Sequence, residues 1–170
     1  MSFGSQPTLR GRLVHLRPLR LEDRRDLYAV AADPLIWEQH PVKNRHEEAV
    51  FREFFAESLA SSGALLATDA ETRRVIGSSR FFGHDEERRE VEIGWTFLAR
   101  SHWGGRYNGE LKQLMLRHAF RFVESVVLFV SPENIRSQQA VARIGGVREP
   151  DADAEGRLVY RITASAYGQE

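Results

Sequence analysis

The sequence predicts a single α/β domain of three layers, in which helices flank a mixed sheet. Segments with the strand period of two alternate along the chain with segments of helical period, in the order β, α, α, β, β, β, α, β, α, β. A length of 170 residues is enough for one well-buried core and short for two. We expect residues 1–8 to form a flexible tail and residues 9–170 to form the single domain.

The first third of the chain predicts one strand and two helices. Residues 13–17 alternate between apolar and polar side chains, as a strand does. Residues 21–33 begin with acidic residues and continue with apolar residues at helical spacing. In the second helix, over residues 44–62, Asn44 and Glu47 have the spacing of a capping box.

Three strands follow in succession, at residues 64–69, 74–83 and 89–98, joined by short polar turns. Strands joined in this way predict an antiparallel meander. Alternation divides the third strand between two faces, with Val91, Ile93, Trp95 and Phe97 on one and Glu90, Glu92, Gly94 and Thr96 on the other.

The remaining residues predict two more helices and two or three strands. An amphipathic stripe indicates a helix over residues 107–123, and the apolar run at 126–131 indicates a strand covered on both faces. Residues 134–145 have the pattern of another helix, and 157–164 alternate as the last strand. A further short strand is expected at 146–149.

Composition argues against several classes of function. Lys+Arg and Asp+Glu both total 24, so a nucleic-acid partner held by phosphate attraction is not expected. The chain has no cysteine, which excludes an enzyme-bound thioester, and without a histidine pair at ligand spacing we expect no metal. The sequence has no charged-then-apolar leader and no long apolar run, which predicts a cytoplasmic protein without a membrane partner.

Two carboxylates of the third meander strand are candidates for acid–base chemistry. Glu90 lies near the strand end, where a solvated acid is common. Glu92 lies deeper in the strand, and a partly buried carboxylate with a raised pKa can act as a general base. A solvated strand face is the alternative interpretation for both residues.

Gly104 and Gly105 lie between this strand and the next helix. Because a helix N-terminus offers free N–H groups, and glycines allow close approach to the backbone, a pyrophosphate group fits there. A simple change of chain direction explains the same two glycines. His102, which flanks them, is a weaker candidate for contact with a phosphate or a substrate.

Asn134 and Ser137 share a helical stripe with the apolar residues Val141 and Ile144. Polar groups on such a stripe need partners, because burying them unpaired is costly. A ligand is one source of partners. Helix capping by Asn134, and a bond from Ser137 back to a backbone carbonyl, are the alternatives.

These motifs occur in a characteristic order: a strand with "EIGW", "WG" at the mouth of a helix that carries Glu110, a buried strand, and N-x-x-S with a glycine eleven residues after the asparagine. In this order and spacing they resemble the GNAT acyltransferase superfamily. With "LRPLRLEDRRDL" near the start, they resemble more closely the branch that acetylates the N-termini of ribosomal proteins. The resemblance extends from Leu9 to Arg161.

The resemblance implies a partly splayed, mostly antiparallel sheet, with acetyl-CoA as the donor that an amine attacks directly. By position, the pantetheine arm would pair with the strand from Glu92 to Phe97 and bond to Asn134. Glu92 would accept the proton of the amine through water, and Ser137 would lie near the departing thiolate. The pyrophosphate would be held by the backbone of Trp103, Gly104, Gly105, Arg106, Tyr107 and Asn108.

Two positions depart from the family pattern. Arg106 occupies a place that usually holds glycine or alanine, so its side chain either contacts a phosphate or points outward, and it would weaken the enzyme interpretation if it blocked the groove. Val141 stands where many members carry a tyrosine that protonates the thiolate. Either Ser137 or water would then protonate the thiolate, or the enzyme would have no dedicated acid. A thiol pKa of about 8.5 makes a strong acid unnecessary.

The acceptor is expected to be a primary amine, either a protein N-terminus or a small molecule, in a pocket lined by Trp37, His40 and Trp95. A homodimer is possible. The sequence leaves two other functions open: a sensor that binds CoA or acyl-CoA without catalysis, and an interaction domain whose glycines only turn the chain.

Overall fold

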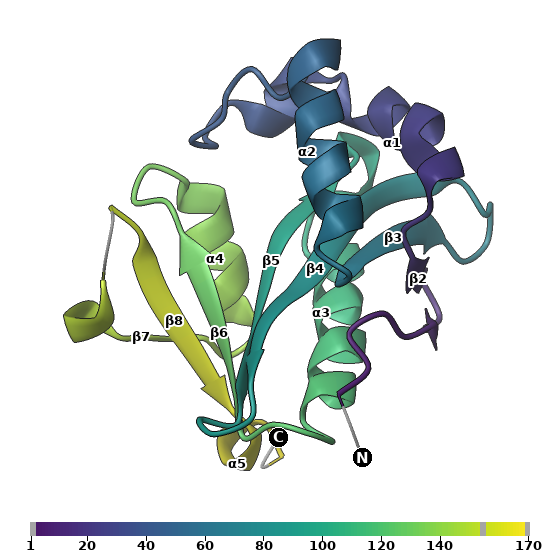
Figure 1. Cartoon of the computed structure of the whole chain (residues 1–170). Helices are drawn as coiled ribbons and strands as arrows, with labels where there is room; N and C mark the ends of the chain where they lie inside the picture. Colours follow the sequence, from purple (N-terminus) through teal and green to yellow (C-terminus); the bar gives the residue numbers. More distant parts are fainter. Residues whose placement is uncertain (1–2, 154–155, 169–170) are drawn as a thin grey trace.

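The computed structural model describes residues 3–153 and 156–168, and places a central sheet between two layers of helices (Figure 1). The sheet has eight strands in the order β1-β2-β3-β4-β5-β6-β8-β7. Neighbouring strands are antiparallel except β5 and β6, which are parallel. The predicted mixed, mostly antiparallel α/β fold is therefore confirmed.

The strands are β1 (Leu9–Arg10), β2 (Val14–Pro18), β3 (Ala64–Asp69), β4 (Val75–Asp85), β5 (Glu90–Leu98), β6 (Ser125–Val130), β7 (Val147–Arg148) and β8 (Leu158–Thr163). The α-helices are α1 (Arg24–Ala31), α2 (Glu48–Ala60), α3 (Arg106–Ala119), α4 (Ile135–Arg143) and α5 (Ala164–Tyr167). Short 3₁₀ helices are η1 (Leu21–Asp23), η2 (Pro34–Trp37), η3 (Arg100–His102) and η4 (Pro150–Ala152).

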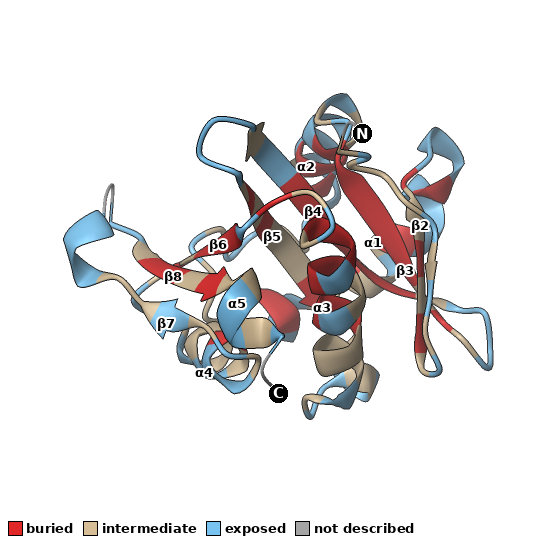
Figure 2. Ribbon diagram, turned by 90° about the horizontal axis from the view of Figure 1, so that it is seen from below, coloured by how far each residue is buried: buried red, intermediate tan, exposed pale blue. Residues whose placement is uncertain are grey.

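Two hydrophobic cores lie on opposite faces of the sheet. One core joins the sheet to α3, through residues such as Leu111 and Met115. The other joins it to α1 and α2, through Leu27, Phe51 and Phe54. Figure 2 shows buried residues along the central strands and on the side of α3 that packs against them. The predicted three layers follow from these two cores.

A β-bulge interrupts β5. Ser78 of β4 pairs with Phe97, and Arg80 pairs with Gly94, so two residues of β5 lie opposite one residue of β4. Trp95 lies inside this irregularity with a φ of 54°, in the left-handed region that non-glycine residues rarely adopt. The extra residue shifts the alternation of the strand by one position.

The bulge changes which side chains share a face. Val91 and Ile93 pack in the core with α3. Phe97 instead packs in the core with α1 and α2, and Trp95 contacts that same core. The expectation that all four share one face was wrong, because simple alternation assumes a strand without an inserted residue. Trp95 and Phe97 instead lie on the same face as Glu92.

The sheet opens between β5 and β6. The two strands pair only over three residues each, from Glu90–Ser125 to Glu92–Val127. Beyond Glu92 the strands diverge (Figure 1), so the rest of β5 has no neighbouring strand on that side. The partly splayed sheet that the sequence resemblance implied is confirmed, and the gap exposes backbone groups of β5.

The N-terminal segment contacts the domain. The Phe3 ring lies 5.2 Å from that of Phe81, and His118 Nε2 lies 2.6 Å from the carbonyl oxygen of Gly4. Residues 9–10 form β1, an edge strand that the sequence pattern did not predict. The division between a flexible tail at 1–8 and a domain at 9–170 stays a prediction.

The start of α2 differs from the prediction. The helix begins at Glu48 with Glu47 as its N-cap residue, and the backbone N–H of Glu47 donates to the carbonyl of Asn44. The expected capping box of Asn44 and Glu47 was wrong, because these residues form a turn before the helix.

Candidate functional site

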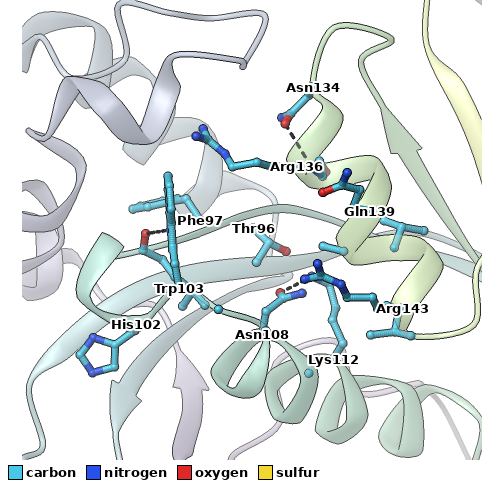
Figure 3. A pocket seen from close by; sticks show the side chains of 18 of the residues that line it. Thr96, Phe97, His102, Trp103, Asn108, Lys112, Asn134, Arg136, Gln139 and Arg143 are labelled. Carbon is cyan, nitrogen blue, oxygen red and sulfur yellow. Dashed lines mark hydrogen bonds between the residues drawn. The ribbon is translucent and has the colours of Figure 1, made fainter.

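A cavity of about 470 Å³ lies beside the open part of β5 (Figure 3). Its walls come from the end of β5, the turn before α3, the first half of α3, and α4. Ile36 and Trp37 of η2, together with His40, also line it. The gap between two strands and the N-terminus of a helix therefore open into one space.

The charges that line the cavity have one sign. Lys112, Arg136 and Arg143 line it, whereas no Asp or Glu is among its described lining residues. Figure 3 shows Lys112 and Arg143 directed towards the space between α3 and α4. Unbalanced positive charge in a partly enclosed space attracts an anionic ligand. The cavity is thus suited to phosphate groups.

The glycine turn leaves the start of α3 open to a ligand. Gly104 and Gly105 have φ values of 114° and 99°, which glycine adopts without strain. Gly105 is the N-cap residue, so no side chain caps the first N–H groups of α3. These groups and the helix dipole favour an anion at this end. Both glycines line the cavity, as does Asn108 in the first turn.

Arg106 and Tyr107 are not among the residues that line the cavity. The Arg106 side chain is exposed, so it does not block the groove, and the Tyr107 ring packs 4.5 Å from that of His102. The guanidinium beside the turn belongs to Arg143, whose Nη1 lies 3.6 Å from the position that a Gly105 Cβ would occupy. Sequence reasoning missed Arg143, because α4 is distant from the turn along the chain.

Lys112 is a second residue that sequence reasoning missed. Its side chain is buried, its Nζ donates to Asn108 Oδ1 at 3.0 Å, and burial lowers its pKa to about 8. The sequence did contain a signal for it. Lys112 lies four residues after Asn108 and therefore on the same helix face, and Asn108 lies in the first helical turn after the glycines. It is also one of only two lysines in the chain.

Trp103 and Arg136 approach each other across the cavity. The Arg136 guanidinium lies 4.3 Å above the Trp103 ring, and the Trp103 Nε1–H donates to the carbonyl of Leu98. The backbone N–H of Arg136 also donates to Gln39 Oε1, which joins α4 to the segment after η2. Figure 3 shows Arg136 reaching from α4 towards Trp103.

Asn134 and Ser137 both line the cavity, at the start of α4. Asn134 Oδ1 accepts a hydrogen bond from the backbone N–H of Ser137, which confirms the predicted N-cap. The amide nitrogen of Asn134 has no hydrogen-bond partner in the part of the chain that the structure describes. Capping and ligand binding are therefore compatible, since each uses a different atom of the amide.

Trp37 and His40 form one end of the cavity. The Trp37 Nε1–H donates to the carbonyl of Ala31, and the ring lies 5.2 Å from that of His40. Burial lowers the pKa of His40 to about 4, and its Nδ1 accepts a hydrogen bond from the backbone N–H of Val42. The neutral ring must then carry its proton on Nε2, where it is a donor.

Glu92 and Trp95 do not line this cavity. Glu92 lies on the sheet face below α2, and burial raises its pKa to about 7, against the effects of Arg157 and Arg80. Trp95 lies on the same face and contacts the exposed ring of Phe82 at 5.3 Å. A half-buried carboxylate that titrates near neutral pH is suited to accept a proton.

Two other acids have structural partners. Glu90 Oε2 lies 2.6 Å from Arg161 Nη1 in an ion pair. Both carboxylate oxygens of Glu110 accept backbone N–H groups at the start of β2 and in the turn before it, from Arg12, Leu13 and Val14, at 2.7 to 2.8 Å. These acids join separate segments of the fold.

His102 lines the cavity and is held from both ring nitrogens. Nε2 lies 2.8 Å from Asp69 Oδ2, and Nδ1 lies 2.8 Å from Ser101 Oγ. The pKa of Asp69 is lowered to about 2, chiefly by the backbone N–H of Thr72 and then by His102. His102 thus fixes the turn before α3 to the end of β3.

Residues 3–153 and 156–168 contain neither a cluster of metal-ligating side chains nor a helix that could span a membrane. No three His, Asp or Glu side chains there are grouped so that they could hold a metal ion. None of the helices in this part of the chain has the length and apolarity to cross a bilayer. The expected cytoplasmic location stays a prediction.

The chain matches a family and several solved structures. The family model of the acetyltransferase (GNAT) domain matches residues 13–147. An acetyltransferase from Agrobacterium tumefaciens is 29% identical with a TM-score of 0.73, over 92% of this chain and 94% of that one. No curated protein matches the chain.

Two structures of lower sequence identity share the fold. A GCN5-related N-acetyltransferase from Brucella melitensis has a TM-score of 0.83 at 17% identity, over 96% of this chain and 81% of that one. RimJ from Mycobacterium smegmatis, solved with CoA-disulfide, has a TM-score of 0.71 at 20% identity, over 95% of this chain and 88% of that one.

Proposed function

Because the chain belongs to the GNAT acetyltransferase family, whose members transfer acyl groups from acyl-CoA, we propose that it acetylates a primary amine with acetyl-CoA as the donor. The acceptor is a protein N-terminus or a small-molecule amine. Acetyl-CoA supplies an activated thioester, so the residues of the chain need only bind the two substrates, orient them and move protons.

The observation that carries this proposal is the charge and shape of the cavity. Three cationic side chains and no described carboxylate line it, and the uncapped N-terminus of α3 opens into it. CoA carries several phosphate negative charges on a long, narrow body. Arg143 and Lys112, together with the N–H groups that follow Gly105, would hold the phosphates.

The pantetheine arm would lie along the unpaired part of β5. Thr96, Phe97 and Leu98 line the cavity there, beyond the last residue that pairs with β6. Amide groups of the arm can then pair with free backbone groups of β5, as a neighbouring strand would. From the opposite wall, the free amide nitrogen of Asn134 would donate to a carbonyl of the arm.

Glu92 would act as general base, accepting the proton of the attacking amine through water. A pKa of about 7 makes it a suitable acceptor near neutral pH. The amine would attack the thioester carbonyl directly, since the chain has no cysteine to carry the acetyl group. The bond to sulfur would break with the electron pair leaving on the thiolate.

The thiolate has no strong acid in this arrangement. Val141, at the place of the family tyrosine, is buried and apolar. Ser137 lines the cavity and would donate to the departing sulfur. Because a thiol has a pKa of about 8.5, such a weak donor or water is sufficient.

Acceptor binding would involve the end of the cavity at Trp37 and His40, and the adjoining face at Trp95. His40 offers an N–H donor at that end, and Trp95 lies beside Glu92 on the sheet. The sequence resembles the branch that acetylates the N-termini of ribosomal proteins, and peptides with free N-termini therefore belong in any panel of acceptors.

An acceptor screen with a free-thiol readout tests the proposal. We expect acetyl-CoA to raise the melting temperature, and thiol to appear only when an amine acceptor is present, with mass spectrometry of the product showing one added acetyl group. Binding without thiol release over peptides, polyamines and aminoglycosides would support a sensor instead. Absence of any stabilisation at millimolar acetyl-CoA would contradict both.

A further inference from the structure

Two arginines stack on aromatic rings: Arg80 of β4 on Trp95, and Arg45, in the segment before α2, on Phe54. Arg80 of β4 is 5% exposed, and its Nη2 donates to Ser58 Oγ at 2.7 Å. Its guanidinium lies 4.1 Å above the Trp95 ring. Arg45, in the segment before α2, lies 4.4 Å above the ring of Phe54. Both guanidinium groups are therefore held against aromatic rings.

Neither arginine forms an ion pair with a carboxylate among the described residues. Within residues 3–153 and 156–168, no Asp or Glu oxygen lies within 4.0 Å of either side chain, and the Nε of each is buried without a hydrogen bond. Burial lowers the pKa of Arg45 to about 10 and also lowers that of Arg80. Such uncompensated burial of charge is costly unless a ligand supplies the anion.

The charged groups that face these arginines do not neutralise them. Glu57, on the exposed side of α2, attracts both at longer range, and Glu92 attracts Arg80. Since the raised pKa leaves Glu92 only partly ionised at neutral pH, the two arginines and the described carboxylates around them carry more positive than negative charge.

The two arginines also flank the expected meeting point of the substrates. Arg45 lies 5.3 Å from the ring of Trp37, which forms one end of the cavity. Arg80 stacks on Trp95, beside the proposed base Glu92. An anionic group held between the arginines would thus lie close to the amine that reacts.

We propose that the acceptor carries a carboxylate, and that Arg45 and Arg80 bind it and so place its amine at Glu92. The inference rests on the proposed acetyltransferase function and names the class of its acceptor. A carboxylate fits because its two oxygens match the planar fork of a guanidinium. The same positive charge repels polyamines and aminoglycosides, which the proposal excludes as good acceptors.

Matched acceptors test the proposal through kcat/KM, measured by thiol release. One series contains ω-amino acids of increasing length and their carboxamides. The other contains peptides with Asp or Asn, and Glu or Gln, after a free N-terminal residue. We expect the best carboxylate to exceed its amide partner by at least about tenfold, the size of one charge-assisted hydrogen bond.

Variants assign this preference to the arginines. Arg45→Gln should remove the preference through a higher acceptor KM while leaving the affinity for acetyl-CoA unchanged. The control is Arg52→Gln, because Arg52 is exposed on α2 and pairs with Glu48 of the same helix. Arg80→Lys keeps a charge in the buried position but loses the planar fork, and its melting curve shows whether it folds.

The outcomes separate the two proposals. Equal kcat/KM for carboxylates and amides, or an unchanged preference in Arg45→Gln, would overturn the inference while thiol release still upheld the acetyltransferase function. If acetyl-CoA neither binds nor releases thiol with any acceptor, the proposed function itself is wrong.

Discussion

Replacing Glu92 with glutamine tests whether burial of one carboxylate sets both the rate and the stability of this enzyme. Glu92→Gln keeps the shape of the side chain but removes its ability to accept a proton. General-base catalysis contributes roughly 10²- to 10⁴-fold to a rate, so we expect kcat to fall by that factor. Affinity for acetyl-CoA should change little, because Glu92 does not line the cavity.

The pH dependence follows from the same carboxylate. Because burial raises its pKa to about 7, wild-type kcat should rise up to about tenfold per pH unit below pH 7 and then level off. The variant should lack this inflection. Its remaining pH dependence would then report the amine of the acceptor alone.

Stability should move in the opposite direction. Folding raises the pKa of the Glu92 carboxyl from 4.5 to about 7, because burial disfavours its ionised form. The ionised carboxylate therefore destabilises the folded state, whereas the protonated form does not. Its penalty therefore grows as the pH rises from 4.5 to 7 and stays constant above that range. The full penalty would be about 3 kcal/mol, and partial exposure of the side chain to solvent reduces it to about 1 to 2 kcal/mol.

Glu92→Gln should consequently stabilise the protein by about 1 to 2 kcal/mol at pH 8 and very little at pH 4.5, as measured by urea unfolding at both values. Glu90→Gln is the matched control on the same strand. It loses an ion pair with Arg161 but should keep the kinetic inflection. An unchanged rate for Glu92→Gln, or an inflection near pH 7 that survives in it, would refute its role as the base.

Three further predictions concern the cavity and the fold. Arg143→Gln and Lys112→Met should each weaken acetyl-CoA binding in calorimetric titrations by about tenfold, the loss of one charge-assisted phosphate contact, and unchanged binding in both would remove these two side chains from the phosphate site. Glu110→Ala should lower the free energy of unfolding by about 2 to 4 kcal/mol, because three backbone N–H groups lose their acceptor, and a loss below about 0.5 kcal/mol would show that water replaces it. Deletion of residues 1–8 should lower the melting temperature through loss of the Phe3 contacts, whereas an unchanged value would fit a tail without a structural role.

Much of the fold was predictable because its signals are local. The period of the apolar residues indicated the meander and the main helices, and the order of the strand, the glycine turn and the Asn134 cap indicated the site. These features depend on neighbours within a few residues. The start of α2 was mispredicted for the same reason, since Asn44 has the right local pattern but lies in a turn fixed by more distant packing.

The remaining features depend on contacts between distant segments. No local pattern shows that the strand carries an extra residue at Trp95, and that residue decides which face Phe97 occupies. Arg143 reaches the glycine turn only because α4 folds back over α3. Arg45 and Arg80, separated along the chain, come together only when α2 packs on β4.

The short pairing of β5 with β6 has a mechanical consequence. Strand pairing between β1–β5 and β6, β8 and β7 is limited to three residue pairs among the described residues, so the sheet resembles an open book whose spine lies at Glu90–Glu92. In the proposed binding mode, CoA contacts both parts of the sheet region, β5 on one side and α4 on the other, and so joins these two leaves at their open edge. The leaves should therefore be stiffest while CoA is bound, and the departure of CoA must break that tie in every turnover. Substitutions of Val91 or of its partner Val126, which leave the proposed base Glu92 in place, would then change the rate of product release more than the rate of amide formation.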